Sequence, residues 1–335
     1  MRIAVVILNW NGKALLEEFL PSVTRYSRES RIYVADNAST DDSIDFITTH
    51  YPKVRIIRNK VNGGYAKGYN DALKHLDEDV FILLNSDVEV TPNWLPPIVK
   101  EFEQHPETAA VQPRILDYRK PRFFEYAGAA GGFIDRFAYP YCRGRIFDSI
   151  EKDKGQYEDR TRIFWASGAC LAIRREDFYL AGGLDEDYFA HQEEIDLCWR
   201  LFNLDRDVVY IGNSKVYHLG GATLNSMDPR KTFFNFRNSL FSLVKNAPGK
   251  EVLAIIFARL ILDGIAGVKF FLQFRFPHTL AIVKAHFSFY SNLGKLLRKR
   301  QKLVQKKNYF QTNSILVEFY IKGRKNYREI NKKSF

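Results

Sequence analysis

Short apolar runs alternate with helical patterns over the first 90 residues. Each run is continuous and bounded by polar residues, which is typical of a strand buried on both faces. Between the runs, apolar residues such as Leu16 and Phe19 recur at helical spacing. This alternation predicts right-handed βαβ units and an α/β fold with a mostly parallel sheet. The four runs occupy residues 3–8, 31–35, 54–57 and 80–84.

The pattern is less regular after residue 116. Residues 116–160 are rich in Gly, Tyr, Phe and Arg, and we expect loops and short strands there that lie over a site. Residues 164–173 form a strand-like run with an interior glycine, Gly168, and such a glycine often marks a bulge or the close approach of a ligand. Residues 193–202 have an apolar stripe at helical spacing, and residues 208–211 predict another strand.

From residue 226 to the end, the chain has a different character. Residues 253–274 and 281–297 predict two long helices, separated by Pro277, and the stretch from Ile315 alternates weakly, as in a strand or a disordered tail. We therefore divide the chain into an α/β domain, residues 1–225, and a helical basic extension, residues 226–335.

The first candidate for chemistry follows the apolar run 80–84. Asn85, Ser86 and Asp87 come directly after it, and Glu89 lies two residues further on. Ligands bind at the carboxyl ends of the strands in open α/β sheets, so we interpret this segment as a metal and phosphate site, with Glu89 ranked below Asp87. A strand end with ordinary solvated carboxylates is the simpler alternative.

A glycine-containing loop precedes the third predicted helix. It runs from Asn62 through Gly63 and Gly64 to Asn70. A helix that begins after such a loop can bind an anion with its free backbone N–H groups. The spacing fits neither of the common phosphate-binding glycine motifs, and glycine serves plain turns equally well.

Acidic residues open the helix predicted at 193–202. Glu193, Glu194 and Asp196 fall in its first turns, where the helix dipole favours negative charge in any protein. The functional alternative is a general base at the mouth of the sheet. His218 lies in a run of apolar neighbours, where a histidine is more often a core residue than a ligand.

Charge is distributed unevenly along the chain. The net charge is +11, yet residues 1–229 carry −7 and residues 230–335 carry +18. Apolar helices beside basic clusters are typical of elements that lie on an anionic membrane surface, and a helical dimer or packing domain is the alternative. We find no RNA-binding signature and expect no nucleic-acid partner.

Three cysteines without CxxC spacing argue against a disulfide framework and suit a reducing compartment. No stretch of 18 uncharged apolar residues predicts a membrane span. The start of the chain shows no signal-peptide pattern. We therefore expect a cytoplasmic protein, peripheral on the inner face of the membrane.

Taken together, the motifs are more specific than any one of them. In chain order they are Asn9-Trp-Asn-Gly, Asp36-Asn-Ala-Ser, Asn62-Gly-Gly, Asn85-Ser-Asp, Gly182-Gly-Leu-Asp, Glu193-Glu-Ile-Asp-Leu-Cys-Trp-Arg and His218. Over roughly residues 1–225 this order resembles a family 2 glycosyltransferase with the GT-A fold, in particular the bacterial rhamnosyltransferase-like subgroup.

The resemblance implies an inverting transferase that uses a nucleotide-diphosphate sugar, a divalent cation (Mg²⁺ or Mn²⁺), and a saccharide or polyprenyl-diphosphate-linked saccharide acceptor. It implies Glu194 or Glu193 as the general base, and Asp87 with His218 at the metal. It implies acceptor contacts by Trp165, Gly168 and Asp196. The donor would be bound by Asn9, Asn11, Asp36, Asn62, Gly63, Gly64, Asn70, Asn85, Ser86 and Asp87.

Two other classes of function stay open. A sugar nucleotidyltransferase would have a similar fold, but such enzymes usually carry a Gly- and Arg/Lys-containing loop directly after the first strand, and Asn9-Trp-Asn-Gly12 lacks that composition. A non-catalytic sugar- or nucleotide-binding relative would be expected to lose the Glu193–Glu194 pair, which this chain keeps.

Overall fold

The computed structural model describes residues 1–220 and 228–331. The predicted domain boundary at 225–226 lies outside these residues. One large sheet of nine strands forms the centre of the molecule, in the order β11-β13-β6-β12-β4-β1-β2-β3, with β5 paired to β13. Its strands are β1 (Ile3–Asn9), β2 (Arg31–Asp36), β3 (Arg55–Arg58), β4 (Val80–Asn85), β5 (Val88–Val90), β6 (Thr108–Asp117), β11 (Arg160–Ile163), β12 (Cys170–Arg174) and β13 (Asp207–His218).

The predicted βαβ half of the sheet is confirmed. β1 pairs in parallel with both β2 and β4, and β2 pairs in parallel with β3. β12 runs antiparallel between β4 and β6, while β13 runs parallel to β6. The carboxyl ends of β1, β2, β4 and β13 therefore lie at the same edge of the sheet.

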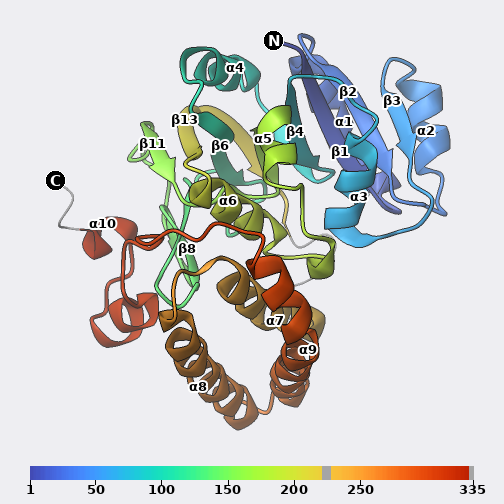
Figure 1. Cartoon of the computed structure of the whole chain (residues 1–335). Helices are drawn as coiled ribbons and strands as arrows, with labels where there is room; N and C mark the ends of the chain where they lie inside the picture. Colours follow the sequence, from blue (N-terminus) through green and yellow to red (C-terminus); the bar gives the residue numbers. More distant parts are fainter. Residues whose placement is uncertain (221–227, 332–335) are drawn as a thin grey trace.

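Helices cover both faces of the sheet (Figure 1). Alternate residues of β1 belong to different cores: Val5 lies in the core that includes residues of α1, α2 and α4, whereas Val6 lies in the core that includes residues of α3, α5, α6 and α7. This double burial explains why β1 and β4 are apolar at every position before their terminal asparagines. The helices are α1 (Lys13–Tyr26), α2 (Ser43–His50), α3 (Gly64–Leu73), α4 (Leu95–Gln104), α5 (Arg175–Leu180), η1 (Glu186–Tyr188), α6 (Glu193–Asn203), α7 (Pro229–Asn246), α8 (Glu251–Leu272), α9 (Phe276–Arg300), η2 (Val317–Ile321) and α10 (Tyr327–Ile330).

The irregular region after residue 116 contains a second, four-stranded sheet, as the expectation of short strands required. Its strand order is β10-β9-β8-β7. After α9 the chain returns to this sheet (Figure 1), where Tyr309 and Ile315 hydrogen-bond near its first strand. The strands are β7 (Gly132–Ile134), β8 (Pro140–Cys142), β9 (Arg145–Ile146) and β10 (Ser149–Ile150).

Two sequence predictions about elements were wrong in part, and a third was too short. In the run 164–173, the strand begins only at Cys170, because Phe164 and Trp165 hydrogen-bond to Gly132 of β7. The strand predicted at 208–211 is confirmed and is longer than expected, since β13 continues to His218 with a shift in register between Ile211 and Lys215. After Ile315, the residues that the structure describes form helical turns, η2 and α10, where a strand or a disordered tail was expected.

α7, α8 and α9 form a helical lobe beside the sheet domain (Figure 1), and α7 packs against α6. Buried ion pairs join the two parts. Lys245 of α7 lies 2.5 Å from Asp185 and 2.8 Å from Asp196 of α6. Lys299 of α9 also pairs with Asp185, and Arg200 pairs with Asp196 within α6.

Burial would raise the pKa of both carboxyl groups, but the lysines and Arg200 outweigh it and hold the pKa of Asp185 and Asp196 below the usual range. Both residues are therefore carboxylates at neutral pH. Breaking a buried pair leaves an uncompensated charge in the interior, which is far more costly than losing a pair on the surface.

This network generates a stability prediction. Replacing Lys245 with Met should lower the free energy of unfolding by about 3 kcal/mol, because Asp185 and Asp196 stay buried with fewer cationic partners. Lys250→Met is the matched control, since Lys250 is exposed and its loss should change stability by less than about 0.5 kcal/mol. Urea denaturation followed by circular dichroism measures both. Equal stability of the two variants would mean that the network does not hold the helical lobe to the sheet domain.

Candidate functional site

Polar side chains end three adjacent strands at one edge of the sheet. Asn9 of β1 is in register with Asp36 of β2, and Asn85 of β4 is in register with Leu8 of β1. The parallel pairing therefore brings together three predicted donor-binding residues that lie far apart in the sequence. This edge is where open α/β sheets bind ligands.

Asp36 is held in place by its neighbours. Its carboxylate accepts hydrogen bonds from the Ser39 backbone N–H at 3.2 Å and from the Asn9 amide at 3.5 Å. The Asn9 amide oxygen is buried and has no hydrogen-bond partner within the described part of the chain. Asn11 has a left-handed backbone (φ 50°), and its side chain accepts the Thr40 N–H at 2.7 Å. Asn9 and Asp36 thus form a small, fixed polar surface.

The Asn62-Gly63-Gly64 loop is also pinned at this edge. The Asn62 side chain accepts hydrogen bonds from the Asn37 amide (2.9 Å) and the Gly64 N–H (3.0 Å). Gly64 has φ 80°, and a Cβ there would lie 2.5 Å from the Phe189 carbonyl oxygen. Glycine is therefore required at position 64, both for the backbone conformation and for the close approach.

Asn70 has a different environment from the other predicted donor contacts. Both polar atoms of its side chain bind the backbone of Leu184, at 2.8 and 3.0 Å. It fastens α3 to the segment before α6, so the position of Asn70 fits a structural role better than the donor contact predicted from the sequence.

The structure brings Asp87 and His218 together. β5 pairs with the end of β13, which puts His218 Nε2 3.1 Å from the Asp87 carboxylate. On the other side of the ring, Nδ1 faces Glu125 at 3.4 Å, too poorly aligned for a hydrogen bond. The Asn85 amide is 3.5 Å from Nε2. A carboxylate behind one ring nitrogen commonly orients a histidine so that its other nitrogen can bind a metal.

Charge at this cluster follows from its burial. Burial lowers the pKa of His218, but Glu125 and Asp87 outweigh that effect and raise it to about 10. Burial also raises the pKa of Asp87, but the His218 imidazolium more than offsets this, and the net pKa is lowered. His218 is therefore an imidazolium at neutral pH, and a divalent cation bound at Nε2 would have to replace its proton.

This donor set fits a divalent cation that takes its remaining ligands from elsewhere. A carboxylate and an imidazole are suitable ligands for Mn²⁺ and, less well, for Mg²⁺. Among residues 1–220 and 228–331, no group of three or more His, Cys, Asp or Glu side chains is arranged to hold a metal. Asp87 and His218 would need oxygens from a bound diphosphate or from water.

The two glutamates lie at the first turn of α6. Glu193 is buried, and one of its carboxylate oxygens has no hydrogen-bond partner in the described chain. Burial, reinforced by Glu194, raises the pKa of Glu193 well above its usual value. Glu194 is partly exposed, and burial raises its pKa to about 7, against the opposing effect of backbone N–H groups at the helix start. Glu194 is therefore the carboxylate suited to accept a proton near neutral pH.

Tyr65 connects the loop, the metal candidates and the glutamates. Its backbone N–H donates to the Phe189 carbonyl at 2.8 Å, and its hydroxyl donates to the Gly168 carbonyl at 2.7 Å. The adjacent Ala169 carbonyl accepts the Asn85 N–H. Burial raises the pKa of Tyr65 well above its usual value, and the negative charges of Glu193 and Glu194 add to the effect. Gly168, a predicted acceptor residue, therefore lies between the strand end and the helix that bears the glutamates.

The other two predicted acceptor residues are in the interior. Trp165 is buried, and its indole N–H donates to the Phe133 carbonyl at 2.9 Å. Asp196 is fully buried in the ion-pair network with Lys245 and Arg200. An acceptor cannot reach either side chain in this geometry, so both predictions are corrected. The reason is that α7, which supplies the partner of Asp196, is distant in sequence.

Sequence reasoning missed Glu125 and Tyr65. Tyr65 directly follows Gly63 and Gly64, so its place beside the predicted donor loop could have indicated a role at the site. Glu125 lies in the irregular region after residue 116, where no periodicity places a side chain.

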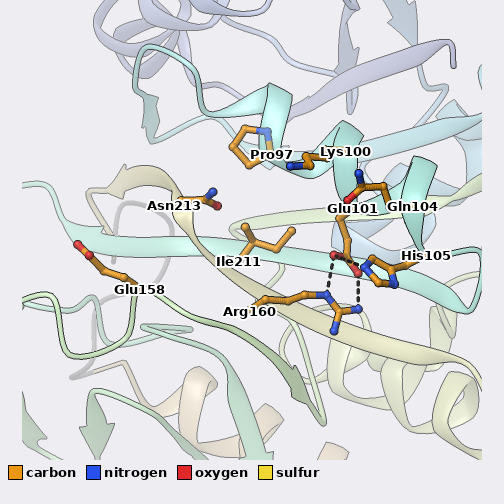
Figure 2. A pocket seen from close by; sticks show the side chains of 9 residues that line it. All are labelled: Pro97, Lys100, Glu101, Gln104, His105, Glu158, Arg160, Ile211 and Asn213. Carbon is orange, nitrogen blue, oxygen red and sulfur yellow. Dashed lines mark hydrogen bonds and ion pairs between the residues drawn. The ribbon is translucent and has the colours of Figure 1, made fainter.

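The structure also contains a pocket of about 220 Å³ elsewhere (Figure 2). Two of its charged residues pair with each other, because Arg160 donates two hydrogen bonds of 2.7 and 2.8 Å to Glu101. The pocket contains none of the residues predicted to act. It is lined by Pro97, Lys100, Glu101, Gln104, His105, Glu158, Arg160, Ile211 and Asn213.

Comparisons with known proteins give a consistent result. The model of the family described as glycosyl transferase family 2 matches residues 4–180. The chain is 27% identical over 231 residues to an N-acetylglucosaminyl-diphospho-decaprenol L-rhamnosyltransferase of Mycobacterium tuberculosis, which covers 64% of this chain and 75% of that protein. It is 24% identical over 208 residues to rhamnosyltransferase WbbL of Escherichia coli, covering 59% of this chain and 75% of that protein.

A solved structure shares the fold. The mannosyltransferase PcManGT from Pyrobaculum calidifontis, in complex with GDP-Man and Mn²⁺, superposes with a TM-score of 0.53 at 14% identity. The match covers 86% of this chain and 87% of that one. The predicted GT-A fold is confirmed by this likeness.

The geometry behind His218 generates a prediction. Glu125→Gln removes the negative charge that orients the imidazole, and it should weaken Mn²⁺ binding in the presence of UDP or GDP by about 10- to 100-fold. Calorimetric titration with Mn²⁺ measures the change. Glu103→Gln, at an exposed residue of α4, is the control, and this variant should bind Mn²⁺ as the wild type does. Without a nucleotide, the wild-type protein should bind Mn²⁺ weakly, since it offers only Asp87 and His218. Tight binding without nucleotide would contradict this assignment.

Proposed function

The chain belongs to glycosyl transferase family 2 and is a glycosyltransferase, and on this premise we propose its substrates and mechanism. The enzyme moves a sugar from a nucleotide-diphosphate donor to a saccharide linked to a lipid through a diphosphate, with inversion at the anomeric carbon. The observation that carries the proposal is Glu194, a partly exposed carboxylate with its pKa raised to about 7. Tyr65 lies close to it and hydrogen-bonds to Gly168, whose neighbour Ala169 binds Asn85, two residues before Asp87.

The donor binds along the sheet edge. Asn11, which is exposed, and Asp36 contact the nucleoside at the ends of β1 and β2. Asn9 is fully buried and acts through Asp36, whose carboxylate it holds with its side-chain amide. Asn62, Gly63 and Gly64 lie beside the diphosphate at the start of α3. The N–H groups of Gly64 and Tyr65 already bind Asn62 and Phe189, so it is the positive end of the helix dipole that favours an anion here.

The Asp87–His218 pair would hold a divalent cation, Mg²⁺ or Mn²⁺, together with oxygens of the diphosphate. When bound, such a cation offsets the negative charge that develops on the leaving nucleoside diphosphate. Asn85, the last residue of β4, and Ser86 lie directly before Asp87. Their side chains would add polar contacts to the donor next to the cation.

Glu194 acts as the general base. It accepts the proton of the attacking acceptor hydroxyl, whose oxygen then displaces the diphosphate from the opposite face of the sugar. Glu193 remains protonated, because it is buried and its pKa is raised well above its usual value. The acceptor approaches beside Gly168 and Tyr65, where the strand end meets α6.

This function is tested with a panel of nucleotide sugars, dTDP-L-rhamnose among them, and N-acetylglucosaminyl-diphospho-prenol as acceptor. The wild-type protein should transfer one sugar, and Asp87→Ala should abolish transfer. Glu194→Gln should lower kcat by about 100-fold or more, because a positioned base contributes at least that much. Full activity in both variants, measured by chromatography of the products, would overturn the proposal.

Two further variants separate the glutamates. Glu193→Gln retains the neutral side chain that burial favours, so it should keep most of the activity. Glu176→Gln, on the exposed side of α5, is the control. The wild-type rate should rise with pH and level off above about 7, because the carboxylate form of Glu194 is the active one and its pKa is raised. An inactive Glu193→Gln with an active Glu194→Gln would assign the base to Glu193.

We also propose that the helical lobe docks on an anionic lipid surface. α8 has an inverted distribution of polarity. Its central charged residues, Arg259 and Asp263, are buried and form an ion pair of 2.7 Å. The exposed residues from Leu253 to Val268 are all uncharged. The apolar docking face comprises Leu253, Phe257, Ile261, Ile265, Val268, Phe271 and Leu272 of α8 with Phe274, Phe276, Leu280, Val283 and Phe287 beyond it.

A lipid surface fits this face better than water does. Exposed contiguous apolar patches of this kind mark interaction sites, and the basic side chains Lys269, Lys284 and Arg298 are exposed on the same helices. Lysine and arginine beside an apolar face favour anionic headgroups. Within residues 1–220 and 228–331, none of the helices combines the length and apolarity needed to cross a bilayer. The cytoplasmic side of the membrane and a homodimer stay predictions.

Vesicle sedimentation tests the docking face. The double variant Phe257→Ser/Ile265→Ser should reduce binding to phosphatidylcholine vesicles containing phosphatidylglycerol by about tenfold or more, since each substitution removes roughly 1.5–3 kcal/mol of apolar burial. Leu180→Ser, at an equally exposed leucine of α5 (64% exposed), is the control. Unchanged sedimentation of the double variant with vesicles would exclude a lipid surface as the partner of the docking face. Wild-type dimers in light scattering that the double variant dissociates would assign the face to a second copy of the chain.

A further inference from the structure

The segment that connects η1 to α6 has an unusual backbone. Phe189, His191 and Gln192 have φ values of 61°, 68° and 68°. None of them is glycine, and side-chain-bearing residues rarely adopt such conformations. Gln192 directly precedes Glu193, and α6 starts there without a side-chain cap. Such a segment persists only where the surrounding structure holds it.

Residues of helix α7 hold the segment in this conformation through hydrogen bonds. The Asn238 amide nitrogen lies 3.2, 2.9 and 2.6 Å from the carbonyl oxygens of Tyr188, Ala190 and His191. One buried side chain thus lies within hydrogen-bond distance of three carbonyl groups of the segment. Gln192 in turn donates its side-chain N–H to the Asn235 carbonyl at 3.2 Å.

Arg237 fixes the orientation of that amide. Its Nε donates to the Asn238 side-chain oxygen at 2.8 Å, which leaves the amide nitrogen facing the segment. Its terminal nitrogen donates to the carbonyls of Asp187 and Tyr188, at 3.0 and 2.9 Å. The guanidinium also lies over the rings of Phe234 and Phe241, which limits its movement.

The opposite side of the segment contacts the donor loop. The Phe189 carbonyl accepts the Tyr65 N–H at 2.8 Å, and it lies so close to Gly64 that a Cβ there would clash. The segment therefore lies between the donor loop and α7, and it ends at the two glutamates. One turn of α6 after Glu193, Asp196 accepts hydrogen bonds from Lys245 and Asn246 of α7.

We propose that Asn238 is a positioning residue, which holds the strained Phe189–Gln192 segment so that Glu194 faces the acceptor hydroxyl. This inference rests on the proposed role of Glu194 as base. Asn238 itself touches no reacting atom. A displacement of the base by about 1 Å can cost about 100-fold in rate, and without Asn238 the segment relaxes toward ordinary backbone conformations.

Asn238→Ala tests the proposal. With dTDP-L-rhamnose and N-acetylglucosaminyl-diphospho-prenol, or the productive pair from the panel, kcat should fall by about 100-fold, while KM for the donor changes little. The pH at half-maximal rate should move from that of the wild type, because the surroundings of Glu194 change. Hydrogen–deuterium exchange of residues 189–196, measured without substrates, should accelerate.

Asn203→Ala is the matched control. Asn203 is also a buried asparagine, at the far end of α6, where it binds the backbone of Asn246 and Lys306. The Asn203→Ala variant should destabilise the fold about as much as Asn238→Ala does. It should leave kcat, the pH profile and hydrogen–deuterium exchange at residues 189–196 near those of the wild type. An equal loss of kcat in both variants would show that Asn238 serves only the fold, and wild-type kcat in Asn238→Ala would overturn the proposal.

A second variant covers the case in which Asn238→Ala does not fold. Gln192→Gly suits the left-handed backbone and should fold normally, yet it loosens the segment and should also lower kcat; unchanged kcat would count against the proposal. A wild-type protein that transfers no sugar refutes the proposed function alone, because exchange at residues 189–196 still reports whether Asn238 holds the segment.

Discussion

The ion-pair network around Asp196 is the constraint on which the arrangement of the site depends. Asp196 is fully buried in the helix that bears Glu193 and Glu194, and its partners are Arg200 on the same helix and Lys245 on α7. A buried ion pair adds little net stability compared with apolar packing, but losing one partner is costly. The network therefore fixes one register of α7 against α6, since any other register would leave a carboxylate unpaired.

That register determines which parts of the chain form the site. The proposed donor side consists of strand ends and a glycine loop, held by short-range hydrogen bonds such as Gly64 N–H to Asn62. The proposed acceptor side depends on contacts of α7 with α6 and with the segment before it, among them those of Asn238. The helical lobe thus contributes to the proposed catalytic site as well as to the proposed docking face. In this proposal, one lobe both positions Glu194 and docks on the lipid surface that carries the acceptor.

The sequence predicted well wherever the signal was local. Each apolar run from 3–8 to 80–84 became a strand, and for β1 and β4 burial on both faces explains the continuous apolar residues. Asp87 follows β4 closely and Glu193 and Glu194 open α6, as expected from the sequence, while their chemical roles stay predictions. The predictions for Trp165, Asp196 and Asn70 did not fit, since each of these side chains binds a segment that is remote in sequence. No spacing rule could reveal those partners.

The sequence by itself determined the α/β class of fold, the order of the site motifs and the basic, apolar character of the last hundred residues. These properties follow from periodicity, turn chemistry and composition, which act over a few residues at a time, and the resemblance of the motifs to family 2 glycosyltransferases narrowed the fold to GT-A. Only the tertiary structure decided that Glu125 stands behind His218, that Arg259 and Asp263 turn inward on α8, and that Asn238 holds the strained segment before the glutamates. Glu125 and Asn238 are remote in sequence from the residues they contact, and Arg259 faces inward because it binds Phe137 and Ser239.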